Sequence, residues 1–163
     1  MGQELKKNPS WALPGSSVYL NCLHMLTRNT HFSIGVHVLT ALAVHRGSPV
    51  TSTKLAESVD TNPAFLRQVI GQLRKAGLVQ TKLGKGGGSL LDREAQDISL
   101  LDVYRATVGT AGLATHDCPP DSECFVAQGV PQVMSRLSAR LDAAVAAELA
   151  GTSIAQVAEE VRV

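Results

Sequence analysis

The side chains best suited to chemistry are two cysteines, Cys118 and Cys124, which are separated by five residues in a proline-containing stretch. A disulfide needs its two Cα atoms within about 7 Å, and a loop of this length allows that approach. The pair therefore fits a thiol–disulfide switch, and it fits equally two cysteines that have no sensing role. A third cysteine, Cys22, makes the count odd, which argues for thiols kept reduced rather than for a secreted disulfide framework.

A glycine-rich segment, Gly84–Gly88, is a second chemical candidate because such loops cradle phosphates in nucleotide-binding proteins. The phosphate loop, however, separates its two glycines by four residues and continues through Lys and Ser or Thr into a helix. In this chain a strand-like run, 78–82, precedes the glycines and another, 89–91, follows them. The pattern therefore indicates the tip of a β-hairpin, with Lys82 and Lys85 supplying its charge.

Catalytic and metal-binding constellations do not stand out elsewhere in the sequence. Neither a Ser-His-Asp order nor a carboxylate pair is evident, and His37 and His45 are too far apart to be two ligands one helical turn apart. We therefore expect a protein that is not an enzyme and that has no metal site and no cofactor. With these classes excluded, we expect the protein to bind another macromolecule.

Two consecutive helices are predicted before the hairpin. Thr51 or Ser52 suits the N-cap of a short helix. After a turn, Asn62 and Pro63 suit the N-cap and the first residue of a second helix, and Gly77 suits its left-handed end. Helix, turn, helix, strand and glycine-rich tip in this order predict a winged helix-turn-helix, which places its second helix in the major groove of DNA.

The second helix carries polar and small residues off its apolar stripe, of the types that contact base edges and phosphates. An ordinary amphipathic helix with a solvated face would show the same pattern, and the flanking helix and hairpin favour DNA. The run over 29–45 is apolar on nearly every side, so we expect it to be a buried helix against which both helices lie. The predicted DNA contacts are Thr51, Ser52, Thr61, Asn62, Pro63, Ala64, Arg67, Gln68, Gln72, Lys82, Lys85, Gly86 and Gly87.

The net charge of +1 conceals an uneven distribution. Residues 49–85 carry six basic and two acidic side chains, a net charge of +4, whereas residues 92–163 carry five arginines and eleven acidic side chains, a net charge of −6. A basic segment suits a polyanion, although unevenly placed surface charge gives the same count. No uncharged apolar run approaches the roughly 18 residues of a membrane span, and the first residues lack the apolar middle of a signal peptide. We therefore expect a cytoplasmic protein without a membrane partner.

The segment 51–91, TSTKLAESVDTNPAFLRQVIGQLRKAGLVQTKLGKGGGSLL, followed by DISLLDVYRAT, resembles the Rrf2 family of bacterial regulators. The similarity extends from Met25 to the C-terminus. The resemblance implies a dimeric winged-helix repressor whose long C-terminal helix crosses to the partner subunit. It also implies that Asn62, Ala64 and Arg67 lie where family members read bases.

Two departures from the family pattern bear on function. Many members carry an arginine at the tip of the wing, where this chain has Leu83, so the contact there would fall to neighbouring lysines. Sensor members hold an iron–sulfur cluster with three cysteines near 118–124, whereas this chain has two and carries Ala127 in place of a downstream histidine. The chain is more similar to the cluster-free branch, and we expect no iron–sulfur cluster.

A long C-terminal helix is predicted over 131–150, with Pro131 in its first turn and Gly151 as its cap, before a last short helix capped by Thr152. Its thin apolar stripe suits a seam against a second copy, although packing within one subunit would give the same pattern. With the resemblance, the predicted dimerisation residues are Met134, Leu137, Leu141, Val145 and Leu149. A Ser-x-x-Asp at Ser99 predicts another short helix with a capping box.

The sequence thus predicts a mainly α (α+β) protein in three parts. Residues 1–24 form a disordered N-terminal extension, 25–108 the winged helix-turn-helix domain, and 109–163 a sensor loop and dimerisation helix. The predicted function is a DNA-binding transcriptional regulator, a repressor that binds a palindromic operator in double-stranded DNA as a homodimer and responds to thiol redox state through Cys118 and Cys124. The alternatives are a cluster-sensing regulator of the same family and a winged-helix module that binds protein instead of DNA. The sequence does not identify the effector.

Overall fold

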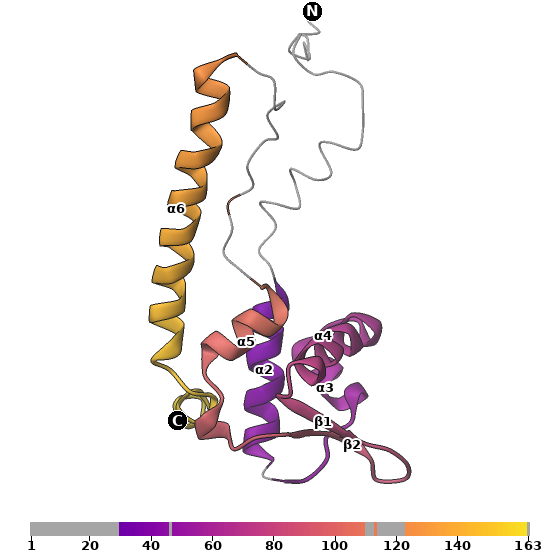
Figure 1. Ribbon diagram of the computed structural model, residues 1–163. Helices are drawn as coiled ribbons and strands as arrows, with labels where there is room; N and C mark the ends of the chain where they lie inside the picture. The colour runs from indigo at the N-terminus through magenta and orange to yellow at the C-terminus, as the bar shows by residue number, and fades with distance from the viewer. Residues whose placement is uncertain (1–29, 46, 110–112, 114–122, 163) are drawn as a thin grey trace, which may run out of the picture.

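The computed structural model describes residues 30–45, 47–109, 113 and 123–162. The elements within these ranges are mainly helical, with one two-stranded antiparallel sheet (Figure 1). They are α2 (Thr30–Val44), α3 (Ser52–Val59), α4 (Pro63–Lys75), β1 (Val79–Lys82), β2 (Gly88–Leu91), η1 (Ala95–Asp97), α5 (Leu100–Thr107), α6 (Phe125–Ala150) and α7 (Ile154–Glu160). The predicted fold class, a winged helix-turn-helix followed by a long C-terminal helix, is confirmed. None of the described helices is long and apolar enough to cross a membrane.

The helix-turn-helix is fixed by local hydrogen bonds at the predicted caps. Thr51 accepts a hydrogen bond from the Lys54 N–H at 3.3 Å, and the Asn62 side chain accepts one from the Ala64 N–H at 2.7 Å. Between the two helices Asp60 adopts the left-handed conformation, with φ 51°, which a short polar side chain tolerates. These caps satisfy first-turn N–H groups that a helix cannot satisfy internally, so each helix begins at the predicted position.

The end of α4 leads the chain directly into the wing. Gly77 has φ +67°, its N–H donates to the Arg74 carbonyl, and the Leu78 N–H donates to the Leu73 carbonyl at 3.0 Å, which is the Schellman arrangement. The predicted alternation over 78–82 is wrong, because Leu78 and Val79 are both buried and the next three residues are exposed. Leu78 is buried by the helix cap rather than by the strand, and beyond Val79 the strand leaves the body.

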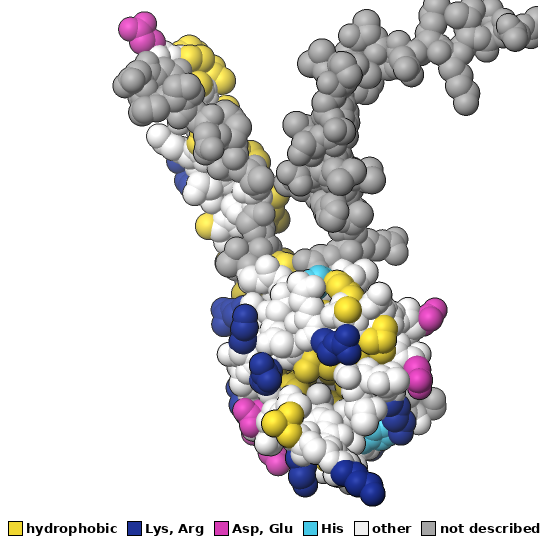
Figure 2. Space-filling model, turned by 90° about the vertical axis from the view of Figure 1, so that its right-hand side faces the viewer, with side chains coloured by type: hydrophobic (Ala, Val, Ile, Leu, Met, Phe, Trp, Pro, Cys, Tyr) yellow, Lys and Arg dark blue, Asp and Glu magenta, His cyan; other side chains and the backbone are white. Residues whose placement is uncertain are grey.

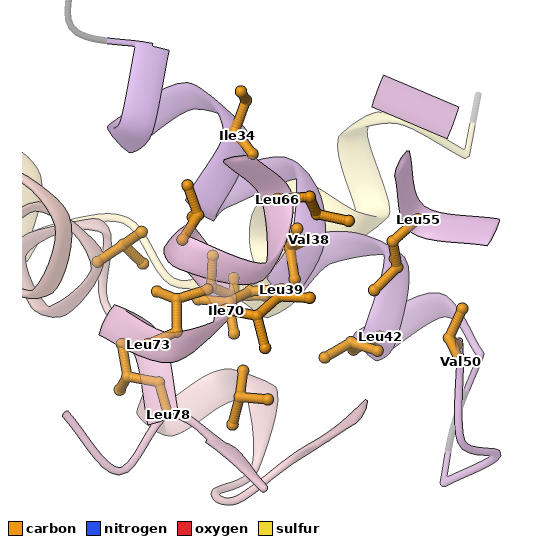
Figure 3. Packing of buried hydrophobic residues seen from close by; sticks show 14 of the residues in the cluster. Ile34, Val38, Leu39, Leu42, Val50, Leu55, Leu66, Ile70, Leu73 and Leu78 are labelled. Atoms are coloured by element: carbon orange, nitrogen blue, oxygen red, sulfur yellow. The ribbon is translucent and has the colours of Figure 1, made fainter. Parts of the chain in front are cut away.

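The hydrophobic core lies around α2, which contacts α3, α4, α5, α7 and β2. Val38 and Leu39 are fully buried and lie near Leu66 and Leu73 of α4 (Figure 3). The prediction that α2 is buried on nearly every side is too strong, because Ser33, His37 and Val44 are exposed. Helices contact α2 on one broad side, which suffices to hold α4 in place.

The wing is an antiparallel hairpin in which Val79 pairs with Leu91 and Lys82 pairs with Gly88. Val50, which precedes α3, adds a bridge to Ser89 through two backbone hydrogen bonds of 3.0 and 2.8 Å. A Cβ atom on Gly88 would lie 2.6 Å from the Val50 carbonyl oxygen, so only glycine permits this approach. The predicted hairpin is confirmed, and its root is joined to the start of the helix-turn-helix.

Helix α5 begins with the predicted capping box, in which Ser99 and Asp102 exchange hydrogen bonds. Helix α6, however, begins at Phe125, six residues before the predicted start, and contains Pro131 in its interior. A proline removes one backbone hydrogen bond, a small fraction of those in a helix of 26 residues. Gly151 is the C-cap but has φ −78°, so it ends the helix without the left-handed conformation.

The last helix, α7, returns the chain to the body. Its N-cap is Ser153, which forms a capping box with Gln156, and not Thr152 as predicted. The Thr152 carbonyl instead accepts the Leu100 N–H at 2.9 Å, and the Ile154 N–H donates to the Ile98 carbonyl at 2.8 Å. Ile154 is fully buried against the core, so part of the predicted 109–163 segment packs with the winged helix-turn-helix.

Candidate nucleic-acid interface

The residues predicted to contact DNA lie outside the core, on the start of α3, the turn, α4 and the wing. Nine are exposed and four are half-buried. The exposed ones are Thr51, Asn62, Pro63, Ala64, Arg67, Gln68, Lys82, Lys85 and Gly86; the half-buried ones are Ser52, Thr61, Gln72 and Gly87. Figure 2 shows this side of the molecule, where Lys and Arg side chains are spread over the face and the acidic side chains lie towards its margins. The face therefore presents positive charge around a helix and a hairpin tip.

Helix α4 is amphipathic, with one side buried in the core and the other side exposed. Leu66, Val69, Ile70 and Leu73 are buried, which fixes the rotation of the helix against α2 and α3. That rotation leaves Ala64, Arg67 and Gln68 exposed on the opposite side. The first turn of the helix is thus free to approach base edges, with Ala64 too small to hold the backbone away.

Two polar side chains of this surface also have structural roles. Asn62 uses its Oδ1 atom to cap α4, which leaves its amide nitrogen as the group directed to another partner. Gln72 is half-buried, and its Oε1 atom lies 3.1 Å from Nδ1 of His31 on α2. His31 also packs edge-on against Phe65, with ring centroids 4.8 Å apart. Gln72 is therefore held towards α2, a contact that the sequence pattern does not reveal.

A hollow of about 300 Å³ lies between α4 and the wing. It is lined by Ser52, Arg67, Ile70, Gly71, Arg74, Thr81, Gly88 and Ser89. Arg67, Gly71 and Arg74 occupy positions i, i+4 and i+7 of α4, which share one side of a helix. Arg74 is not among the DNA contacts predicted from the sequence, although its spacing from Arg67 places both on one side of α4.

The wing tip exposes its lysines and one apolar residue. Lys82 and Lys85 are exposed on either side of Leu83, which has 89% of its surface accessible. Gly87 folds back so closely that a Cβ atom would meet the Lys82 carbonyl oxygen, and its N–H donates to the Gly84 carbonyl at 2.9 Å. The tip is therefore a tight turn made by glycines, with basic side chains directed to its surroundings.

The predicted dimerisation residues lie on α6, which has no buried residue (Figure 1). Leu137 and Leu141 are each 41% exposed, whereas Met134, Val145 and Leu149 are half-buried. Helix α6 also contacts α5 of the same chain, and Asp142 and Ala146 line a small cavity with residues of α5.

The exposed apolar stripe of α6 extends beyond the predicted residues. Val126, Val130 and Val133 are 50%, 39% and 53% exposed and continue the spacing of Leu137 and Leu141 towards the N-terminal end of the helix. Val126 and Val130 precede Pro131, where the predicted helix began, and Val133 lies within the predicted helix but outside the predicted stripe. We call Val126, Val130, Val133, Leu137 and Leu141 the α6 stripe.

Only one of the two cysteines of the predicted redox pair lies in the described part of the chain. Cys124 is exposed and is the N-cap residue of α6, whereas Cys118 lies outside the described residues. Within the described ranges, no group of three His, Cys, Asp or Glu side chains could hold a metal ion. The separation of the two thiols therefore stays a prediction.

Comparison with known proteins gives one consistent result. The Rrf2 family, described as iron-dependent transcriptional regulators, matches residues 28–160. YwnA of Bacillus subtilis, designated an HTH-type transcriptional regulator, is 31% identical over 130 residues, which cover 79% of this chain and 95% of YwnA. A transcriptional-regulator structure from Lactobacillus plantarum superimposes with a TM-score of 0.71 at 28% identity and covers 83% of this chain and 91% of its own. CymR, the global cysteine regulator of B. subtilis, superimposes with a TM-score of 0.61 at 26% identity over 83% of this chain and 98% of CymR.

Because the family is described as iron-dependent, the residues of this chain that could hold an iron–sulfur cluster are of interest. Iron–sulfur clusters take four protein ligands, most often cysteines. The stretch before α6 supplies Cys118 and Cys124, and with His116 the set reaches three. Two cysteines in this stretch fall short of the four that such clusters most often take, so the donor set does not fit a cluster held by cysteines of one chain.

The family match covers most of the chain, and the related proteins are regulators rather than enzymes. The fold supplies the helix, the turn and the wing with which such regulators are built. The resemblance inferred from the sequence is thereby confirmed. The chain belongs to the Rrf2 family and is a DNA-binding transcriptional regulator.

Proposed function

We propose that two copies of the chain bind a palindromic operator and repress transcription, with α4 of each copy in the major groove and each wing on the flanking backbone. The observation that carries this proposal is the exposed side of α4. The buried stripe fixes the rotation of the helix, and the side chains left outside are of the types that bind bases and phosphates.

The first two turns of α4 supply the proposed base contacts. Asn62 and Ala64 lie at the N-terminal end of the helix, and Arg67 and Gln68 follow one turn later. An arginine binds guanine through two hydrogen bonds and a glutamine binds adenine in the same way. Asn62, whose carbonyl oxygen caps the helix, would act through its amide nitrogen as a donor.

The start of α3, the turn and the wing supply the proposed backbone contacts. Thr51, Ser52 and Thr61 carry hydroxyl groups near the N-terminal ends of the two helices. Lys82 and Lys85 add positive charge at the wing, and Gly86 and Gly87 keep its tip narrow. Such contacts fix the position of the protein on DNA without reading sequence, and they make affinity depend steeply on salt.

A second copy of this chain is the proposed occupant of the α6 stripe. Helix α6 has 26 residues and is therefore about 39 Å long at 1.5 Å per residue, and its stripe stays partly exposed along much of that length. Valines and leucines at three- and four-residue steps suit packing against a twin helix. Two α6 helices in contact would hold the two reading helices at a fixed separation, about 34 Å or a multiple of it on DNA.

Selection of genomic fragments bound by the purified protein, followed by fluorescence anisotropy with the selected sites, tests the DNA part of the proposal. We expect Arg67→Ala to relax the base preference at one position of each half-site, and Lys85→Ala to weaken all DNA sequences alike. Arg162→Ala, which removes an exposed arginine that follows α7, is the control and should change neither quantity. Failure of the wild-type protein to bind any fragment at moderate salt would favour the protein-interaction alternative.

Repression is tested separately in cells. Deletion of the gene should raise transcription from promoters that contain the selected sites, and restoring the wild-type gene should lower it again. Restoring an Arg67→Ala variant should not. Lower transcription on deletion would identify an activator and contradict the proposed repression.

A further inference from the structure

We propose that the hollow between α4 and the wing binds a phosphate of the DNA backbone, and that Arg74 is the residue that neutralises it. This inference rests on the proposed function, because it takes α4 and the wing to contact the same DNA. It adds a specific site and a residue that the predicted contacts do not include.

The chemistry of the hollow points to an anion. Its lining residues include two arginines, Arg67 and Arg74, and the hydroxyl-bearing Ser52 and Thr81, and none of them carries a carboxylate. The two other cavities described in the structure differ in this respect. The larger, beside α7, is lined by three acidic residues, and the one between α5 and α6 is lined by Asp142. A volume of about 300 Å³ accommodates a phosphodiester group with its water.

A glycine inside α4 creates part of this space. Gly71 lies between Arg67 and Arg74 on the same side of the helix, and a Cβ atom built on it would have no neighbour within 4 Å. Glycine in a helix interior costs stability relative to alanine, and no packing contact requires it here. Its effect is to keep the surface between the two arginines concave, so that a group from outside can approach both.

The position of the hollow matches the course of a DNA strand. A helix in the major groove and a wing beside it lie on two sides of one sugar–phosphate backbone. The hollow is bounded by α4 through Gly71 and by the hairpin through Thr81 and Gly88, so it lies between these two elements. Bridging hydrogen bonds between Val50 and Ser89 keep the hairpin and the start of α3 together, so the hollow is present before DNA arrives.

Lys75 provides a matched control. It follows Arg74 directly, is exposed on the same helix and carries the same charge, but it does not line the hollow. Loss of general electrostatic attraction would affect both residues alike. Loss of a specific phosphate contact would affect Arg74 alone.

The test measures binding of the full-length protein to a selected operator duplex and to a random duplex of equal length, by fluorescence anisotropy from 50 to 200 mM salt. Arg74→Ala should weaken both duplexes by the same factor and reduce the slope of log K against log [salt] by about 0.9. The loss of affinity over this salt range should then be about threefold smaller than in the wild type. Lys75→Ala should keep the wild-type slope, and Arg74→Lys should recover most of it.

A second pair of variants leaves both arginines in place. Gly71→Glu adds a carboxylate within reach of Arg67 and Arg74, and it should reproduce the loss of affinity and slope. Gly71→Gln has the same size without the charge and should lose less. Circular dichroism melts of each variant establish that the fold is retained.

The outcomes separate the inference from the function on which it rests. Equal slopes for Arg74→Ala and Lys75→Ala, or equal binding by Gly71→Glu and Gly71→Gln, would overturn the phosphate site while leaving DNA binding intact. A change in base preference with Arg74→Ala would overturn it in favour of base contact. Absence of wild-type binding to both duplexes would instead count against the proposed function.

Discussion

Truncation of the α6 stripe should convert a dimer into monomers and thereby weaken operator binding. Leu137 and Leu141 are each 41% exposed, so about two-fifths of each side chain is available for burial by a partner. Complete burial of a leucine side chain contributes about 1.5–3 kcal/mol, so this fraction corresponds to about 1 kcal/mol per leucine in each copy. A symmetric dimer loses that amount twice, about 2 kcal/mol for one leucine-to-alanine change and about 4 kcal/mol for both.

These free energies translate into large changes in self-association. At 1.4 kcal/mol per factor of ten, Leu137→Ala should raise the dimer dissociation constant about 30-fold, and the double variant several hundred-fold. Because alanine favours helix at least as well as leucine, α6 itself should stay folded. Sedimentation velocity over a dilution series gives the dissociation constant directly. Anisotropy with a full palindrome and with a single half-site shows whether the effect reaches DNA.

Gln132→Ala is the matched control for these truncations. Gln132 is exposed on α6 and lies about 140° around the helix from Leu137, away from the stripe. We expect it to leave the dimer unchanged. Affinity for the half-site should stay the same in all variants, and affinity for the palindrome should fall only in the leucine variants. A monomeric wild-type protein, or a leucine double variant that dimerises normally, would refute the role of the α6 stripe.

Four further outcomes can be measured on single variants. Thr40→Val should raise the free energy of unfolding by about 1 kcal/mol in denaturant titration, because the Thr40 Oγ1 atom is buried and has no hydrogen-bond partner among the described residues; a loss of stability would show that the hydroxyl is satisfied. Gly88→Ala should cost about 1–3 kcal/mol in the same assay, because its Cβ atom would collide with the Val50 backbone; full stability would contradict the close approach. Leu83→Arg should tighten operator binding at low salt, because it adds a cation to a wing position that is 89% exposed; unchanged affinity would place that residue away from DNA. Mild peroxide should join Cys118 to Cys124 and change DNA affinity, as alkylation mass spectrometry beside anisotropy would show; unchanged binding by the fully oxidised protein would end the redox hypothesis.

The sequence predicted those parts of the fold that short-range interactions decide. The N-caps at Thr51, Asn62 and Ser99 each act over two or three residues, so their residue types suffice to locate the starts of three helices. Gly77 and the glycines of the wing likewise indicate positive φ angles, which other residues rarely adopt. The order of these local signals was enough to identify the winged helix-turn-helix.

The errors lie where another interaction overrides the simple local pattern. Pro131 has a strong preference for a first turn, yet the residues before it also form helix and extend α6 to Phe125. Burial of Leu78 follows from a cap that joins it to Leu73, which a strand pattern cannot show. The contact of Gln72 with His31 joins residues 41 positions apart, so no local pattern could reveal it.

The candidate site divides in the same way. The types of residue on α4 and at the wing could be predicted, because the apolar stripe of the helix determines which side chains stay outside. The hollow between these elements could not, because it depends on how closely the hairpin approaches α4 in space. Arg74 illustrates the difference, since its proposed role depends on the space beside Gly71 rather than on its own position in the pattern.

The bridge between Val50 and Ser89 limits how a signal can act on this protein. Two backbone hydrogen bonds join Ser89 of the hairpin to Val50, which precedes α3. The hairpin therefore cannot move independently of the helix-turn-helix. The winged helix-turn-helix therefore behaves as one rigid unit, and its internal arrangement offers little for a signal to change. In the proposed dimer, what is left to adjust is the spacing and tilt of the two winged helix-turn-helix units, so an inducer would change their relative position rather than the shape of either one.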